Sequence, residues 1–253
     1  MNAAKKILVL FMVLVFLGGL AYALYPTVNG VILTTSSEYA AEVFLNKTEL
    51  VQSLTPAITD TGIPVEAEVP YKDLLDAMEA YNEEIYQEKQ AGLCDAWAYQ
   101  EPSFDLADYG IEDGVIGVIS IPKLDIEMPI YLGATYDNMA KGAAHLSQTS
   151  LPIGGENTNC VIAGHRGWNG ADYFRYIDRL ELGDTVTITN LWEELTYTVS
   201  DIKIIDPNDV DEILIQDGKD MLTLLTCHPY GSGGKYRYVI YCNNITKEEN
   251  YGP

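Results

Sequence analysis

Residues 222–238 read LTLLTCHPYGSGGKYRY, two strand-like runs joined by a turn. The first run is aliphatic and β-branched and ends on Cys227, whereas the second is rich in tyrosine and carries Arg237. A break that contains glycine and proline between two such runs is typical of a β-hairpin. The pairing would bring Cys227 and Arg237 to the same rim. A thiol at such a place is either a small packed residue or a nucleophile with a positive partner.

The same pattern of short strand-like runs extends through the C-terminal half of the chain. The other runs are VIGVISIP, DIEMPIYLG, NCVIAGH, DTVTITN and ELTYTVSDIKII. Short runs separated by Gly, Pro, Asn and Asp predict an antiparallel barrel or sandwich, interrupted by short helices around 137–144 and 171–180. We expect one β-barrel domain over residues 104–246, followed by a tail at 247–253.

The N-terminus holds an uncharged apolar run, Ile7–Leu24. Eighteen residues of helix span about 27 Å, close to the hydrocarbon thickness of a bilayer. The two lysines before the run predict that residues 1–6 are cytoplasmic and that the rest of the chain is extracellular. The sequence Ala21-Tyr22-Ala23 resembles a signal-peptide cleavage site, but the run is longer than most signal cores. The sequence therefore predicts a single-pass membrane anchor over 7–24, with a cleaved signal peptide as the alternative.

An extracellular segment, residues 25–103, separates the anchor from the barrel. Residues 27–67 are weakly patterned and indicate a stalk or an irregular extension. Between Tyr71 and Gln90 an apolar stripe with helical spacing predicts an amphipathic helix that packs on a partner surface. The stripe consists of Leu74, Met78, Tyr81 and Ile85.

The composition limits the classes of function. The chain has 37 acidic and 15 basic residues, a formal net charge of −22, and no basic stripe. Such a chain is a poor nucleic-acid binder, since it cannot displace the counterions of a phosphate backbone. Its four cysteines are too few for a disulfide-built scaffold, and their pairing is left open by the sequence.

Three histidines are the candidates for a base. His165 ends the run CVIAGH and enters a glycine-flanked loop, where an imidazole would be exposed. His145 has no acidic or thiol neighbour, so we interpret it as structural. His228 follows Cys227 directly, and adjacent side chains of a strand point to opposite faces. His165 is therefore the best candidate, although a surface histidine in a turn is the plainer interpretation of it alone.

The same alternation separates the cysteines. In KYRYVIYC, Cys242 lies on the face opposite to Arg237, which predicts that Cys242 is packed in the core. Cys160 lies five residues before His165 on one presumed strand and would face away from it. Cys227 remains as the accessible thiol. A catalytic set of His165, Cys227 and Arg237 is one hypothesis that fits these positions.

These motifs resemble the signature of the sortase family. The motif TLLTC is followed one loop later by an arginine, and AGHRG precedes both. The resemblance covers about residues 113–242 in order, through GVIGVISIPKLDIEMPIYLGA, HLSQTSLPIGGENTNCVIAGHRG, FRYIDRLELGD and GKDMLTLLTCHPYG. The stretch TSLP and the turn after Cys227 most resemble class C, the pilin-polymerising branch.

The resemblance implies an eight-stranded sortase β-barrel with His165, Cys227 and Arg237 as catalytic residues. It implies a cysteine transpeptidase at the surface of a Gram-positive bacterium, with no metal or organic cofactor. The thiol would attack the Thr–Gly bond of an LPxTG-like sorting signal. A pilin lysine, or a cell-wall precursor in a housekeeping enzyme, would resolve the thioacyl intermediate. Trp168 and Thr226 are candidates for lining the substrate groove.

Class C sortases carry an N-terminal lid with an Asp-Pro-aromatic motif. This chain has Asp95-Ala96-Trp97 after the amphipathic helix. We expect Asp95 to approach Arg237 and Trp97 to cover Cys227; an ordinary loop is the alternative, given the missing proline. Three features depart from class C: one extra residue between Cys227 and Arg237, a long segment at 28–69, and no second membrane helix before Pro253.

Three other interpretations compete with a sortase. A papain-like protease would place its cysteine before its histidine, at the start of a helix. A zinc site from His145, His165, Cys227 and His228 lacks the close ligand pairs that make such sites recognisable. A non-enzymatic pilus or adhesion domain explains an exported β-rich chain, but it does not need a rim cysteine aligned with histidine and arginine.

Overall fold

The computed structural model describes residues 3–54, 69–93 and 102–245, and within them eight strands close into a barrel. The strands are β1 (Val115–Ile121), β2 (Ile126–Leu132), β3 (Ala143–His145), β4 (Thr158–Ala163), β5 (Thr185–Thr189), β6 (Glu194–Ile205), β7 (Asp220–His228) and β8 (Tyr236–Asn244). Their order around the barrel is β1-β2-β3-β4-β7-β8-β6-β5, and β5 pairs back with β1. The expected eight-stranded barrel is confirmed.

The barrel is mixed, which corrects the expectation of an antiparallel sheet. The pairs β2–β3 and β4–β7 are parallel, and the other six are antiparallel. Parallel neighbours need a long crossover, and between β4 and β7 this crossover contains the whole β5–β6 hairpin. The inner face of the barrel is aliphatic, and Ile119, Ile130, Ile162, Leu222 and Leu224 are almost fully buried there.

Short helices precede or connect the strands, partly at the expected places. They are α3 (Tyr136–Met139) and four 3-10 turns: Leu106–Tyr109, Pro122–Leu124, Ile177–Arg179 and Val210–Ile213. The helix expected around 137–144 ends at Met139, and Ala143 and Ala144 belong to β3 instead. The helix expected around 171–180 is reduced to one turn at Ile177–Arg179.

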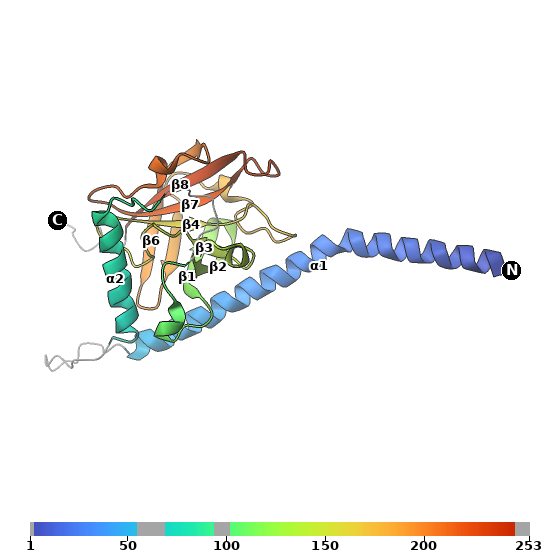
Figure 1. Ribbon diagram of the computed structural model, residues 1–253, viewed down its shortest axis with the longest axis horizontal. Helices are drawn as coiled ribbons and strands as arrows, with labels where there is room; N and C mark the ends of the chain where they lie inside the picture. The colour runs from blue at the N-terminus through green and yellow to red at the C-terminus, as the bar shows by residue number, and fades with distance from the viewer. Residues whose placement is uncertain (1–2, 55–68, 94–101, 246–253) are drawn as a thin grey trace.

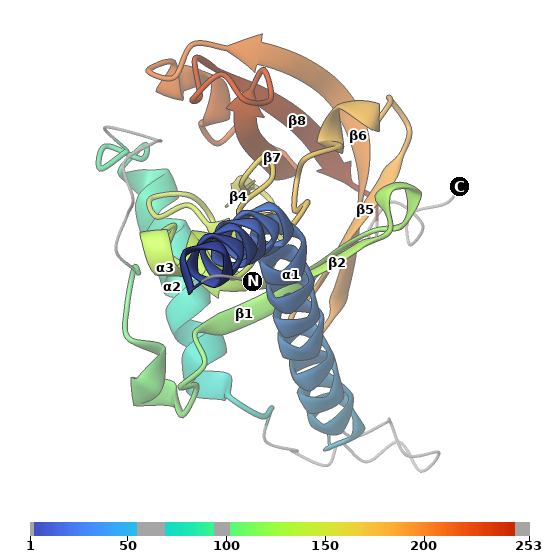
Figure 2. The same cartoon turned by 90° about the vertical axis from the view of Figure 1, so that its right-hand side faces the viewer.

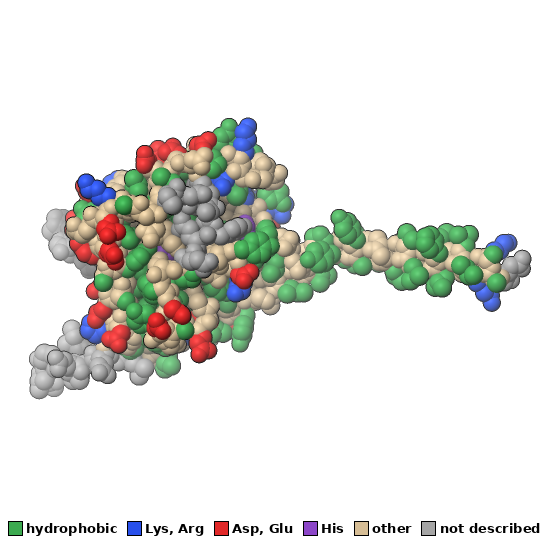
Figure 3. Space-filling view, in the orientation of Figure 1, with side chains coloured by type: hydrophobic (Ala, Val, Ile, Leu, Met, Phe, Trp, Pro, Cys, Tyr) green, Lys and Arg blue, Asp and Glu red, His purple; other side chains and the backbone are tan. Residues whose placement is uncertain are grey.

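One long helix, α1 (Ala3–Leu54), contains the apolar run that was expected as an anchor and continues to Leu54, where an irregular stalk was expected. Its C-terminal half crosses β1 and β2, as Figures 1 and 2 show. The face that it buries repeats every three or four residues through Ser37, Ala41, Phe44, Thr48 and Val51. Its apolar run, Ile7–Leu24, is exposed to solvent along its whole length (Figure 3). It is long and apolar enough to cross a membrane.

The amphipathic helix is confirmed as α2 (Lys72–Gln87). Leu74 and Met78 join the main hydrophobic core, so the stripe faces the barrel. Asn82 completes the attachment: its side-chain amide donates to the Leu151 carbonyl (3.4 Å), and its Oδ1 accepts from the Leu151 amide (2.7 Å). The helix is therefore fixed to the segment between β3 and β4.

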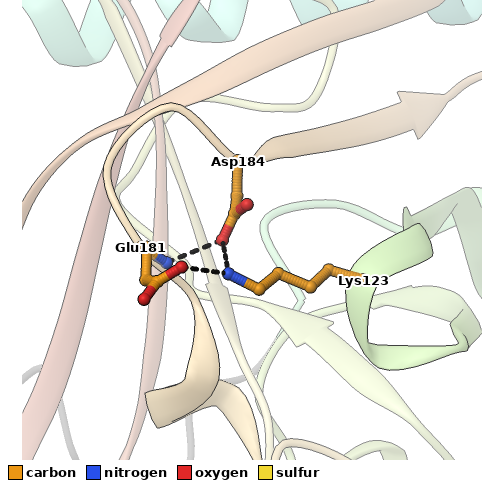
Figure 4. A network of polar contacts seen from close by, with 3 residues as sticks. All are labelled: Lys123, Glu181 and Asp184. Atoms are coloured by element: carbon orange, nitrogen blue, oxygen red, sulfur yellow. Dashed lines mark hydrogen bonds and ion pairs between the residues drawn. The ribbon is translucent and has the colours of Figure 1, made fainter.

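An ion-pair network ties the β1–β2 connection to the turn before β5 (Figure 4). The ammonium of Lys123 lies 2.7 Å from Glu181 Oε2 and 2.8 Å from Asp184 Oδ2. Asp184 Oδ2 also accepts from the Glu181 amide at 2.7 Å. Because the charges are exposed to solvent and screened, the network adds little stability. It does fix the relative position of two turns at the point where β1 and β5 close the barrel.

His145 is a buried structural histidine, in line with the sequence interpretation. Its Nε2 lies 3.1 Å from the carbonyl oxygens of both Thr149 and Ser150. Burial lowers its pKa from 6.5 to about 4, because the charged imidazolium would lose its hydration.

This shifted pKa predicts a loss of stability in acid. The unfolded chain binds a proton at His145 near pH 6.5, but the folded chain does so only near pH 4. The contribution of neutral His145 to the free energy of unfolding is therefore fully present above pH 6.5. It is lost as the pH falls from 6.5 to 4, by up to about 3 kcal/mol. We expect His145→Gln to make urea midpoints less different between pH 7.5 and pH 4.5. If the two urea midpoints differed as much in His145→Gln as in the wild type, His145 would not be the source of the acid sensitivity.

Candidate active site

Strand register brings Cys227 and Arg237 face to face. The two residues are direct partners in the antiparallel β7–β8 pair. Both side chains lie next to Gly234: a Cβ on this residue would lie 2.9 Å from Arg237 Nη1 and 3.2 Å from Cys227 Sγ. Gly234 also has a φ of +84°, which favours glycine. The turn after β7 therefore leaves the thiol and the guanidinium close to one point.

His165 reaches the same rim from the other side of Cys227. In the parallel β4–β7 pair, Ala163 is level with Leu225, so two residues later His165 is level with Cys227. The backbone at Gly164 continues this pairing, since its amide donates to the Leu225 carbonyl at 3.0 Å. Its carbonyl accepts from the hydroxyl of Thr226 at 2.7 Å. The structure thus places His165, Cys227 and Arg237 on three consecutive strand ends.

The His165 ring packs against an aromatic side chain. It stacks on the indole of Trp168 with centroids 4.4 Å apart and an interplanar angle of 10°, and the Tyr136 ring meets that indole edge-on at 5.7 Å. Within the described residues, His165 Nε2 is buried without a hydrogen-bond partner. Burial lowers the pKa of His165, because it disfavours the imidazolium. The environment of the ring therefore favours the neutral imidazole over the imidazolium.

This stack predicts a measurable change in the titration of His165. Trp168→Ala is expected to raise the pKa of His165 toward 6.5, because water regains access to the imidazolium. The shift is measured from the imidazole C–H resonances as a function of pH. Trp192→Phe is the control, since Trp192 lies in the β5–β6 turn and bonds Pro70 instead. Equal titration in wild type and Trp168→Ala would show that the indole does not shield the ring.

The guanidinium of Arg237 is held by backbone oxygens of its own turn. Its Nη1 donates to the carbonyls of Gly234 (2.5 Å) and Tyr236 (3.2 Å). A guanidinium stays protonated at any physiological pH and has five N–H donors. It can therefore donate to a substrate oxygen while the turn holds its orientation.

Sequence analysis missed Arg166, which lies behind Cys227. Its side chain is almost fully buried, and its Nη2 lies 2.6 Å from Asp178 Oδ2. Its Nη1 lies 2.7 Å from His228 Nδ1 and 3.5 Å from the Cys227 carbonyl. The side chain of His228 thus contacts Arg166, and its ring packs against Tyr238 at 5.6 Å. In the sequence, the one indication of this role is the position of Arg166: it follows His165 directly, so its side chain points to the opposite face of the chain.

The other thiols are packed in the core. Cys160 and Cys242 are almost fully buried, as alternation along the strands predicted, whereas Cys227 is half-buried. Burial raises the pKa of the Cys242 thiol to about 12 and also raises that of Cys160. Both remain thiols near neutral pH, so Cys227 is the accessible sulfur of the three.

The remaining sequence predictions are placed as follows. Trp168 lies at the rim against His165, and Thr226 is buried with its hydroxyl on Gly164. The expected lid residues Asp95 and Trp97, with Cys94, lie outside the described residues. Over the described ranges, no group of three or more His, Cys, Asp or Glu side chains could hold a metal ion.

Comparison with known proteins identifies the same architecture. The model of the sortase domain family matches residues 119–245. Sortase D of Bacillus subtilis is 35% identical over 132 residues, which are 51% of this chain and 64% of that protein. The chain thus matches less than two thirds of this relative's length.

Solved structures match over a longer part of the chain. Sortase C1 of GBS Pilus Island 1 superposes with a TM-score of 0.65 at 30% identity, covering 83% of this chain and 92% of that one. A structure of Streptococcus agalactiae sortase C1 superposes with a TM-score of 0.64 at 33% identity, covering 70% and 90%.

Proposed function

The chain belongs to the sortase family, and from this membership we propose that it is a cysteine transpeptidase that acts on an LPxTG-like sorting signal. The observation that carries the proposal is the convergence of Cys227 and Arg237 over Gly234, level with His165. A thiol nucleophile, a proton-transfer group and a fixed cation are the three groups that acyl transfer through a thioester needs.

In the proposed first step, the proton of Cys227 passes to His165, and Cys227 Sγ attacks the threonine carbonyl of the Thr–Gly bond. Negative charge develops on the carbonyl oxygen, and the Arg237 guanidinium donates to this oxygen. The C–N bond breaks, His165 delivers a proton to the leaving glycine amine, and a thioacyl enzyme remains. Because the titrations of Cys227 and His165 are coupled, their starting protonation state belongs to the pair and not to either residue alone.

In the second step, an amine attacks the thioester carbonyl and gives a proton to His165. The C–S bond breaks, a new amide bond forms, and Cys227 regains its thiol. We propose a pilin lysine as the amine, on the basis of the likeness to sortase C1 of GBS Pilus Island 1. A cell-wall precursor is the second candidate amine. The apolar half of α1 supports a membrane-anchored enzyme, and the two lysines before the apolar run favour an extracellular barrel.

The test of this function is a transfer reaction with the full chain in detergent. An LPxTG-type peptide is offered together with either a pilin lysine peptide or a cell-wall-type amine, and products are identified by mass. We expect cleavage at Thr–Gly and an amide product whose yield rises with the pilin lysine at the expense of hydrolysis. Cleavage that is equally fast for a scrambled peptide would favour a protease instead.

Arg237 provides a separate prediction. Arg237→Ala is expected to lower kcat about 10²–10³-fold, because a preorganised oxyanion donor is lost. Arg237→Lys keeps the charge but not the planar donor pair, so it should recover only part of this rate. Lys235→Ala is the control, since Lys235 lies in the same turn with its ammonium 5.2 Å from the Tyr236 ring centroid. An effect confined to KM would contradict the oxyanion role.

A further inference from the structure

Directly after the end of its apolar run, the helix α1 contacts the loop that follows His165. The run ends at Leu24. The backbones of Pro26 and Gly30 lie so close to the backbone of Gly170 that a Cβ would fit on neither Gly30 nor Gly170. The side-chain Nδ2 of Asn29 also donates to the backbone carbonyl of Asn169 at 3.0 Å. Asn169 and Gly170 lie four and five residues after His165, so one contact joins the anchor to the active-site loop.

The helical rise fixes the height of this loop above a membrane. With 1.5 Å per residue, Pro26 lies about 3 Å and Gly30 about 9 Å beyond Leu24 along the helix axis. The headgroup layer of a bilayer is about 5–8 Å thick on each side of the hydrocarbon. If the apolar run spans the hydrocarbon, the contact with Gly170 occurs within or just above the headgroups.

Aromatic side chains gather around this contact. Tyr22 and Tyr25 are exposed on α1 where the apolar run ends. Around the loop, Tyr136 packs on Trp168, and Tyr230 lies 3.2 Å from the Cβ position of Gly167. Tyr176 faces α1 across a cleft that Pro26 also lines. We call these six residues the aromatic collar: Tyr22, Tyr25, Tyr136, Trp168, Tyr176 and Tyr230.

Two arginines lie at the surface beside the collar. Arg166 is buried against Asp178, whereas Arg175, which also pairs with Asp172, and Arg179 are accessible to solvent. Arg175 lies over the rings of Tyr230 (4.6 Å) and Tyr176 (5.5 Å), and Arg179 lies over Tyr176 (4.2 Å). Tyrosine, tryptophan and arginine are the side chains that favour the membrane–water interface.

We propose that the aromatic collar is a membrane-contacting surface that seats the active-site rim of the barrel in the phospholipid headgroup layer. This inference rests on the proposed membrane anchor. Figure 1 shows that the β7–β8 connection and the apolar half of α1 lie on the same side of the barrel. The rim with Cys227 then faces the bilayer, and the enzyme selects substrates whose scissile bond is presented close to the membrane surface.

Two tryptophans at opposite ends of the barrel allow a direct test. Trp168 lies in the collar, whereas Trp192 lies two residues from Asn190, whose carbonyl accepts from Thr48 on α1. Thr48 is about 36 Å beyond Leu24 along the helix. The full chain is prepared with Trp168 alone (Trp97→Phe with Trp192→Phe) and with Trp192 alone (Trp97→Phe with Trp168→Phe). Each is reconstituted into phosphatidylcholine–phosphatidylglycerol vesicles that carry a nitroxide on the headgroup.

We expect the nitroxide to quench most of the Trp168 emission and little of the Trp192 emission. Inserting seven residues after Leu24 lifts the barrel by about 10 Å and should remove most of the Trp168 quenching. Equal quenching of both tryptophans in chains that float with the vesicles would refute the seating but leave the anchor intact. Failure of the full chain to float with the vesicles would refute the anchor and the seating together. Neither result depends on transpeptidase activity, so the enzymatic proposal is tested separately.

Discussion

Replacing Cys227 with alanine is expected to reduce both cleavage and transfer to background, a loss on the order of 10⁴-fold or more. The proposed reaction forms a covalent bond to this sulfur, and no other described thiol is accessible, because Cys160 and Cys242 are buried in the core. Stability should change little, since the Cys227 side chain is only half-buried at the rim.

Cys242→Ala is the matched control for this substitution. Cys242 lies on β8 five residues after Arg237 and faces the core, so the variant should lose stability but keep kcat per folded molecule. Peptide cleavage and urea unfolding measured on the same samples separate the two effects. Residual activity of Cys227→Ala above a few per cent would exclude Cys227 as the nucleophile.

Replacing His165 with alanine is expected to lower kcat about 10²–10⁴-fold, the usual contribution of a positioned acid–base group. The leaving amine would lose its proton donor, and the attacking amine would lose its acceptor. The variant should also lose the part of the pH–rate profile that belongs to the coupled Cys227–His165 titration. Initial rates between pH 5 and pH 9 measure both effects.

His228→Ala is the control, because this histidine is adjacent to Cys227 in sequence. Its Nδ1 bonds Arg166, and its ring packs against Tyr238, on the face of β7 away from the thiol. The variant should keep most of kcat and the shape of the pH profile. A larger loss in His228→Ala than in His165→Ala would reverse the assignment of the proton-transfer group.

Alternation along the strands made much of the barrel predictable from sequence. It assigned Cys242 and Cys160 to the core, as found, and left Cys227, at the end of its strand, as the accessible thiol. It could not predict β3, because three residues, Ala143–His145, carry too short a pattern. Nor does period-two alternation distinguish parallel from antiparallel pairing. The parallel pairs β2–β3 and β4–β7 follow from crossovers, which are properties of the whole chain.

The second half of α1 was missed because its buried face is partly polar. Ser37 and Thr48 alternate with Ala41, Phe44 and Val51 at helical spacing, so the apolar stripe is interrupted. Helix propensity is a weak prior that packing overrides, and here packing on β1 and β2 holds the helix. Arg166 was missed for a similar reason, since its partners Asp178 and His228 come together only in the folded chain.

One measurement tests the central claim directly: the intact mass of the full chain shortly after mixing with an LPxTG-type peptide, without added amine. The account predicts an adduct of the peptide truncated after threonine, located on the proteolytic fragment that contains Cys227 and removed by hydroxylamine. The adduct should be absent from Cys227→Ala. Cleavage of the peptide at Thr–Gly without any adduct on this fragment, in a rapid-quench time course, would contradict covalent catalysis by Cys227.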